Sequence, residues 1–309
     1  MSSSNPMGPT VVAVEMEDAA PRRARLRLSK ARNVAERRGP FATLGIYLGL
    51  TIAAVIMAFP FVFSVMTAFK SPKDFATNSP FSLPENWTLE SFRAVLGGRV
   101  DFASAIWTTL LVVLVLVVCQ VSSSVFAAYA FARLQFPGRD AVFWMFLATM
   151  MIPATVIVIP LYMMMAKMGL NNTFWGIVLP FMLASPYAVF LLRESFRGIP
   201  QEIIDAAQID GAGQLGILLR VVVPMSKPIL ATLTLITVVS QWNSFMWPRI
   251  IASQNPKVIT VATAAMQSQY NANWTYVMAA TTIALVPLII LFVIFQKQIV
   301  GSIALTGLK

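Results

Sequence analysis

The stretch IPQEIIDAAQIDGAGQLGILLRVVVP, residues 199–224, is rich in polar and small residues yet lies between two long apolar runs. Pro200 suits the first turn of a helix, where its missing N–H costs nothing. Glu202 places a negative charge at the positive end of that helix's dipole. Asp210-Gly211 ends the helix, because glycine readily takes the left-handed cap conformation. The first half of the stretch therefore predicts a short capped helix.

The second half of the stretch predicts a return helix, over about residues 214–223 and closed by Pro224. Ala206 and Ala207 are small, so the surface of another protein can approach the first helix closely. Asp205 adds one charge for a positive partner. Two interpretations follow: a docking helix–turn–helix at a membrane surface, or an ordinary amphipathic surface hairpin.

Composition places the chain among polytopic membrane proteins. Of its 309 residues, 57% are hydrophobic and only 12% are charged, and the mean hydropathy is +0.72. There is no histidine and only one cysteine, Cys119, which excludes imidazole catalysis, an internal disulfide and a zinc cluster. We predict no metal site.

The formal net charge of +10 does not indicate a nucleic-acid partner. Eight of the 23 Lys and Arg residues lie between Arg22 and Arg38, beside the first apolar run. Basic residues at this place are typical of the cytoplasmic flank of a membrane protein, where anionic lipid headgroups attract them. We expect residues 1–40 to form a basic, disordered cytoplasmic arm.

Six segments are long and apolar enough to cross a bilayer as helices, which takes about 20 residues. The fold class predicted is therefore an all-α integral membrane protein, with one domain over residues 41–309. Prolines inside the third, fourth and sixth segments are expected to kink them. The six segments are residues 41–66, 103–130, 141–166, 174–192, 229–247 and 274–295.

Basic residues orient the chain. If the segments alternate in direction, 16 Lys and Arg residues fall on one side and 7 on the other. The positive-inside rule then puts both termini in the cytoplasm, together with the loop of about residues 193–227 that contains the hairpin.

None of the six segments contains Asp, Glu, Lys, Arg or His. Proton- and sodium-coupled carriers usually need ionisable groups or broken-helix ion sites within the membrane. No G-x-x-x-x-G-K-[ST] phosphate loop occurs either. A transport pathway of this kind would take its energy from a partner.

The hairpin resembles the cytoplasmic signature of ABC-transporter permeases: Glu-Ala-Ala, three residues, Gly, nine residues, then Ile-x-Leu-Pro. The spacing matches throughout, and the departures are conservative, Asp for Glu and Val for Ile and Leu. The matching residues are Asp205, Ala206, Ala207, Gly211, Val221, Val223 and Pro224.

The resemblance extends over nearly the whole chain from residue 41. It is nearest to the second permease subunit of maltose-type carbohydrate importers. The stretches that carry it are TAFKSPKDF (67–75), AAYAFARLQFPGRD (127–140), IDGAG (209–213), QWNSFMWP (241–248) and residues 278–309.

The resemblance implies a type I ABC importer permease: six transmembrane helices with a cytoplasmic coupling helix-turn-helix, in a bacterial cytoplasmic membrane. The chain would carry a sugar or oligosaccharide and would not itself be an enzyme. The expected partners are membrane lipid, a homologous second permease, a dimer of ATPase subunits that binds ATP and Mg, and an extracytoplasmic substrate-binding protein. Coupling to the ATPase would fall to Asp205, Ala206, Ala207, Asp210, Gly211 and Pro224.

Gln241, Trp242, Asn243 and Ser244 form a polar cluster in the fifth segment. Amides and an indole suit sugar hydroxyls, by hydrogen bonding and ring stacking, so the cluster is a candidate lining of the substrate pathway. Polar residues in membrane helices also serve as packing contacts between helices, and that interpretation stays open.

Two other functions stay open. One is an ABC importer for a glycerol-phosphate-type solute, which needs a cationic site that these segments lack. The other is a secondary carrier that works alone, against which both the uncharged segments and the hairpin argue.

Overall fold

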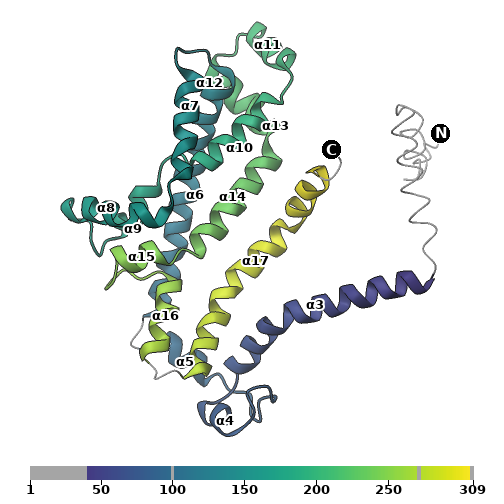
Figure 1. Cartoon of the computed structure of the whole chain (residues 1–309), viewed down its shortest axis with the longest axis vertical. Helices are drawn as coiled ribbons and strands as arrows, with labels where there is room; N and C mark the ends of the chain where they lie inside the picture. The colour runs from purple at the N-terminus through teal and green to yellow at the C-terminus, as the bar shows by residue number, and fades with distance from the viewer. Residues whose placement is uncertain (1–39, 99–100, 270–272, 307–309) are drawn as a thin grey trace, which may run out of the picture. The chain divides into compact units, whose positions relative to one another are not determined.

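The structure, a computed structural model, describes residues 40–98, 101–269 and 273–306. The predicted arm lies outside these residues except for Pro40. The chain divides into two units, residues 1–62 and 63–309, which are described separately (Figure 1). In the first unit, the described residues form the beginning of α3 (Pro40–Ala68).

Within the described residues, three helices are long and apolar enough to cross a membrane: α3, α6 (Phe102–Arg133) and α17 (Trp274–Thr306). They correspond to the first, second and sixth predicted segments. The side chain of Asp101 caps α6 by accepting a hydrogen bond from the Ser104 backbone N–H at 3.0 Å.

The third and fourth predicted segments are each a pair of helical pieces with a sharp bend between them, and the fifth is preceded by such a bend before residue 229. Among the described residues, the number of spans rises from three to six if each bent pair counts as one. The bends measure 98° between Arg139–Met151 and Ala154–Lys167, 41° between Phe174–Phe181 and Pro186–Arg197, and 81° between Gln214–Met225 and Lys227–Trp242.

Proline accounts for the position of each bend. Pro153, Pro186 and Pro228 each lie at or next to the first residue of the second piece. A proline cannot donate to the preceding turn and disfavours helical geometry in the residue before it. The bends expected in the segments 141–166 and 174–192 are present, as breaks between helical pieces, and the fifth segment ends at Trp242 rather than at residue 247.

The pieces of the bent pairs and the remaining short helices complete the fold. The pieces are α7 (Arg139–Ala148), α8 (Ala154–Lys167), α9 (Phe174–Val178), α10 (Pro186–Arg197), α12 (Gln214–Ile217), α13 (Val223–Met225) and α14 (Lys227–Trp242). The short helices are α4 (Pro72–Thr77), α5 (Glu90–Leu96), α11 (Gln201–Ile209), α15 (Met246–Ile251) and α16 (Ile259–Gln269).

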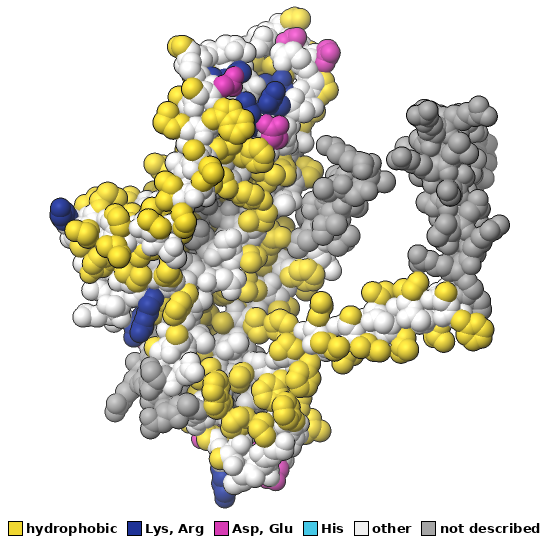
Figure 2. Space-filling model, in the orientation of Figure 1, with side chains coloured by type: hydrophobic (Ala, Val, Ile, Leu, Met, Phe, Trp, Pro, Cys, Tyr) yellow, Lys and Arg dark blue, Asp and Glu magenta, His cyan; other side chains and the backbone are white. Residues whose placement is uncertain are grey.

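In the second unit α6 is the central helix, and α10, α14 and α16 pack along it. One apolar cluster lies where α6 meets α10 and the segment after α11, and includes Tyr129, Phe196 and Ile217. Figure 2 shows Arg, Lys, Asp and Glu side chains gathered at the end that carries α11 and α12, with hydrophobic side chains dominating the surface below them.

The connection after α3 is held by two buried charged residues. The Lys70 ammonium is fully buried and donates to the backbone oxygens of Ser79 and Pro80, each at 3.2 Å. The Asp74 carboxylate accepts from the Asn78 side-chain amide at 2.8 Å and from the Glu85 backbone N–H at 3.1 Å.

These contacts lower the pKa of the Asp74 carboxyl below its usual value. The hydrogen bond from Asn78 is the largest cause, and the Glu85 N–H and the positive charge of Lys70 add to it, while burial acts in the opposite direction.

Candidate functional site

The predicted hairpin is present between α10 and α14. Its first helix, α11, follows Pro200 and ends at Asp210, whose backbone N–H donates to Ala206 O at 3.0 Å. Gly211 then takes φ +83°, the left-handed conformation that glycine adopts without strain. Local sequence rules therefore place both ends of α11 correctly.

One face of α11 is buried and the other is open. Ile204 is only 3% exposed and packs into the apolar cluster below the hairpin, with Ala207 half-buried beside it. On the outward face, Ala206 is exposed and Ile209 is 86% exposed. The two alanines of the signature therefore differ, because only Ala206 lies on the open surface.

The return leg of the hairpin is a helix with one irregular turn. It begins as α12, passes through a π-helical segment, Leu218–Val222, and ends as α13. Pro224 lies inside α13, and the helical run continues to Met225, so the prediction that Pro224 closes the run is wrong. Pro224 has no N–H to donate to the turn before it, and the π-helical segment lies directly before α13.

Arg133, at the end of α6, contacts the last turn of α10 and the outgoing leg of the hairpin, residues 199–209. Its Nη1 donates to Gln201 Oε1 at 2.8 Å, and its Nη2 donates to the backbone oxygens of Phe196 and Ile199. In turn, the Gln201 Nε2 donates to Asp205 Oδ1 at 2.8 Å. Asp205 thus has a partner within the hairpin itself.

Tyr129 contacts the return leg. Its side chain is buried, and its hydroxyl donates to Gln214 Oε1 at 2.7 Å. Sequence reasoning missed this contact and the contacts of Arg133, which it had counted only as a cytoplasmic charge. The available signal was a basic residue in the last turn of a helix, a position that favours bonds to terminal carbonyls.

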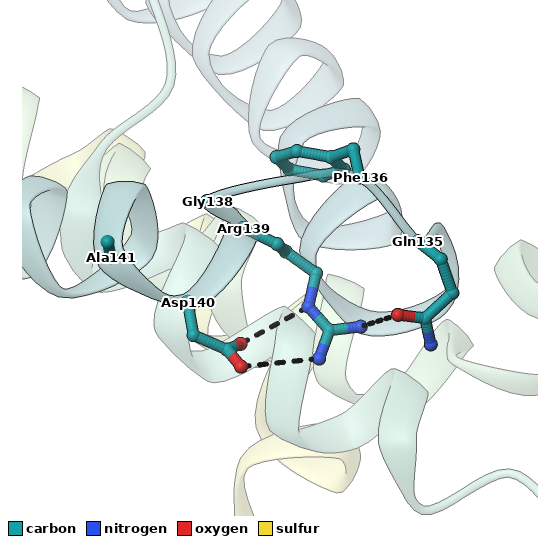
Figure 3. A pocket seen from close by; sticks show the side chains of 6 residues that line it. All are labelled: Gln135, Phe136, Gly138, Arg139, Asp140 and Ala141. Atoms are coloured by element: carbon teal, nitrogen blue, oxygen red, sulfur yellow. Dashed lines mark hydrogen bonds and ion pairs between the residues drawn. The ribbon is translucent and has the colours of Figure 1, made fainter.

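A second arginine cluster lies beside the first without contacting α11. Figure 3 shows the Arg139 guanidinium between the Asp140 carboxylate and the Gln135 amide oxygen, in a pocket formed by the loop after α6. Arg193, on α10, donates to Phe131 O at 3.3 Å and lies over the ring of Phe143 at 3.9 Å. This cluster joins α7 and α10 to the end of α6.

The polar residues of the fifth segment divide between two roles. Trp242 is 4% exposed, and its Nε1 donates to Ala284 O on α17 at 3.2 Å, which is a packing contact between helices. The exposed Asn243 caps α14, and its Nδ2 donates to Val239 O at 2.8 Å.

Asn243 and Trp242 also line a cavity of about 270 Å³. Three threonines, 260, 263 and 281, contribute hydroxyls to the same cavity, and its other lining residues are apolar. Gln241 and Ser244 are not among the lining residues. The structure therefore brings two of the four predicted pathway residues to one cavity.

Comparison with known proteins identifies the family. The model of the family described as "Binding-protein-dependent transport system inner membrane component" matches residues 121–304. The arabinooligosaccharides transport system permease protein AraQ of Halalkalibacterium halodurans is 29% identical over 269 residues, covering 85% of this chain and 95% of the relative.

Another relative and a solved structure agree with this match. The sn-glycerol-3-phosphate transport system permease protein UgpE of Brucella abortus is 29% identical over 276 residues, covering 86% of this chain and 98% of the relative. A chain of a bacterial ABC transporter involved in the import of the acidic polysaccharide alginate has the same fold, with a TM-score of 0.69, 25% identity, and coverage of 83% of this chain and 95% of that one. This chain belongs to the family of inner membrane components of binding-protein-dependent transport systems, the permeases of ABC importers.

Proposed function

We propose that this chain is a permease subunit of an ATP-driven importer that carries a sugar or oligosaccharide into the cytoplasm. A separate ATPase would dock on the hairpin. The observation that carries the proposal is the open face of α11 in a chain of this family, where Ile209 is 86% exposed beside the small, exposed Ala206. Ile203 and Leu215 of the same hairpin are also exposed, at 38% and 58%, and exposed apolar residues grouped on one element are typical of a protein-docking surface.

In this mechanism the chain performs no chemistry. ATP binding and hydrolysis belong to a dimer of ATPase subunits, and closure of that dimer moves the hairpin. The helices then alternate between outward and inward access as a rigid-body change. A second permease completes the pathway, and a binding protein delivers the solute; the binding-protein dependence named in the family description supports the second of these partners.

The cavity beside Asn243 favours a neutral solute rich in hydroxyl groups. Its lining supplies the Asn243 amide and three threonine oxygens that can accept hydrogen bonds from sugar hydroxyls, and the Trp242 ring offers a stacking face; the indole N–H and the threonine hydroxyls already donate to backbone oxygens. A glycerol-phosphate solute is the second candidate, because UgpE is as similar to this chain in sequence as AraQ is. A phosphate calls for Arg or Lys, and neither lines this cavity.

The docking role is tested by co-purification. The chain is expressed with its genomic neighbours, extracted in mild detergent, and assayed for a bound ATPase. Ala206→Arg should abolish the association, because it places a long charged side chain on the open face of α11. Ala207 is less suitable, since its side chain packs against the core.

The matched control is Ala76→Arg, which changes an exposed alanine on the short helix α4. This variant should keep the ATPase. Loss of the ATPase in both variants, or in neither, contradicts docking on α11. Absence of an ATPase from the wild-type sample contradicts the proposal that the chain is a subunit of an ATP-driven importer.

The solute class is tested with the complete system in proteoliposomes. Uptake of a panel of labelled oligosaccharides is compared with uptake of sn-glycerol 3-phosphate. Uptake of an oligosaccharide alone supports the first candidate, and uptake of the phosphate alone supports the second.

A further inference from the structure

Arg133 makes three contacts that a single guanidinium can make at once, two to the hairpin and one to the end of α10. Its donors form a rigid planar fork, and they reach the amide oxygen of Gln201 and the backbone oxygen of Ile199 in the hairpin, and the backbone oxygen of Phe196 in α10. The backbone oxygens of Phe196 and Ile199 lie at the C-terminal end of α10, where the helix dipole favours a positive charge.

The charge of Arg133 is directed to neutral oxygens of the hairpin and of the last turn of α10. In the part of the chain that the structure describes, no carboxylate forms an ion pair with Arg133. The contacts are therefore charge-assisted hydrogen bonds to neutral acceptors, which are stronger than bonds between neutral groups.

Asp205 belongs to the same arrangement. Gln201 accepts from Arg133 through its amide oxygen and donates to Asp205 through its amide nitrogen. Hydrogen bonds in series polarise one another, so the carboxylate strengthens the bond between Gln201 and Arg133.

Tyr129 lies four residues before Arg133 on α6, so the two side chains share one face of the helix. Tyr129 contacts the return leg through Gln214, and Arg133 contacts the outgoing leg. Both legs of the hairpin are thus fastened to the last two turns of a 32-residue helix that contacts α10, α14 and α16.

We propose that Arg133 is a positioning residue that fastens the hairpin to α6, so that displacement of the hairpin moves α6. Asp205 serves the same attachment through its hydrogen bond with Gln201. The inference rests on the proposed function, because the hairpin is displaced only if an ATPase docks on it. It names α6 as the helix that receives this motion.

The first test measures the attachment in the purified chain and needs no partner. With Cys119 replaced by Ser, spin labels are placed at two exposed positions, Phe126→Cys on α6 and Gln208→Cys on α11. Pulsed electron resonance should give one narrow distance distribution. Arg133→Gln should broaden it, because the three contacts of the guanidinium are lost.

The matched control is Arg139→Gln. Arg139 lies on the same side of the molecule, but its contacts stay within its own loop and the Asp140 carboxylate. This variant should leave the distribution narrow. Equal distributions in wild type and Arg133→Gln would overturn the attachment.

The second test uses the complete transport system. Arg133→Gln should retain the bound ATPase and its hydrolysis while uptake falls about tenfold, the size expected for losing charge-assisted hydrogen bonds. Arg133→Lys should lie between the two, because it keeps the charge and loses the fork. Loss of ATPase binding together with uptake would overturn the positioning role.

Asp205 is tested by a pair of variants. Asp205→Asn keeps an oxygen that accepts from Gln201 and should retain uptake within about twofold, whereas Asp205→Ala should lose most of it. Equal damage by the two variants would mean that the charge itself matters, which overturns the role of Asp205 through its hydrogen bond with Gln201. Failure of the wild-type chain to bind an ATPase contradicts the proposed function, while the distance measurement still decides the attachment.

Discussion

Gly176 lies where α9 approaches the preceding loop, and this position has no room for a side chain. A Cβ at this position would lie 2.2 Å from Leu170 O and 3.1 Å from Ile251 Cγ1. Its backbone oxygen accepts from Trp247 Nε1 at 3.1 Å, which holds α15 against α9. The absence of a side chain is therefore what lets these segments meet.

We expect Gly176→Ala to destabilise the protein by about 1–3 kcal/mol, the usual cost of overpacking a core. Thermal unfolding in detergent measures the effect. Gly216→Ala is the matched control, because its Cβ would meet only Ala212 Cβ at an ordinary 3.8 Å. A melting temperature for Gly176→Ala equal to that of wild type would contradict the close approach.

Asn243 and Trp242 are neighbours in sequence with different expected roles. Asn243→Leu removes an amide from the cavity, so it should raise the apparent KM for uptake by about tenfold, the cost of one or two hydrogen bonds. Trp242→Phe removes the bond to Ala284 O and should lower the melting temperature instead. Uptake kinetics and melting curves of both variants check this division; an unchanged KM for Asn243→Leu would assign it to packing.

At the scale of elements, the segment from Lys70 to Glu85 responds to acid through Asp74. Because the folded pKa is lowered, its ionised form stabilises the protein above the ordinary pKa of about 4, and this contribution is lost as the pH falls through the folded pKa. The stability difference between wild type and Asp74→Asn should therefore shrink with falling pH.

Melting temperatures of both proteins from about pH 7 to about pH 3 provide the measurement. Asn78→Ala removes the largest cause of the shift, so it should move the acid transition towards higher pH. A difference that is constant over this range would show that the Asp74 charge contributes nothing.

The elements differ in how far the sequence determines them. The ends of α11 follow from Pro200 and Gly211, because capping depends on residues within one turn. The break at Pro153 was expected only as a kink, since membrane helices often continue through proline and the 98° angle depends on packing with other segments. The short helix α16 was not predicted, because at 11 residues it is too short for a span.

The contacts at the candidate site were hidden for a related reason. Counting charges places Arg133 on one side of the membrane but names no partner. Its three acceptors lie 63 to 68 residues away in sequence, and only the packing of α10 on α6 brings them together. Local patterns therefore predicted the hairpin, while tertiary contacts determine what holds it.

At the scale of the whole molecule, the distribution of Lys and Arg predicts opposite sides of the membrane for α4 and α11. With Cys119 replaced by Ser, a single cysteine at Ala76 should react with a membrane-impermeant maleimide in intact cells. A cysteine at Gln208 should react only after the membrane is permeabilised. The reverse pattern would invert the topology and remove the hairpin from the reach of a cytoplasmic ATPase.

The π-helical turn at Leu218–Val222 has a consequence for the chain's tolerance of insertions and deletions. Such a turn holds one more residue than an α-helical turn between the same flanks. Deleting one residue here converts it to regular helix and leaves α12 and Lys227–Trp242 in phase. The same deletion within α6 rotates every later side chain by about 100°. Single-residue deletions should therefore be tolerated at this turn and not in α6.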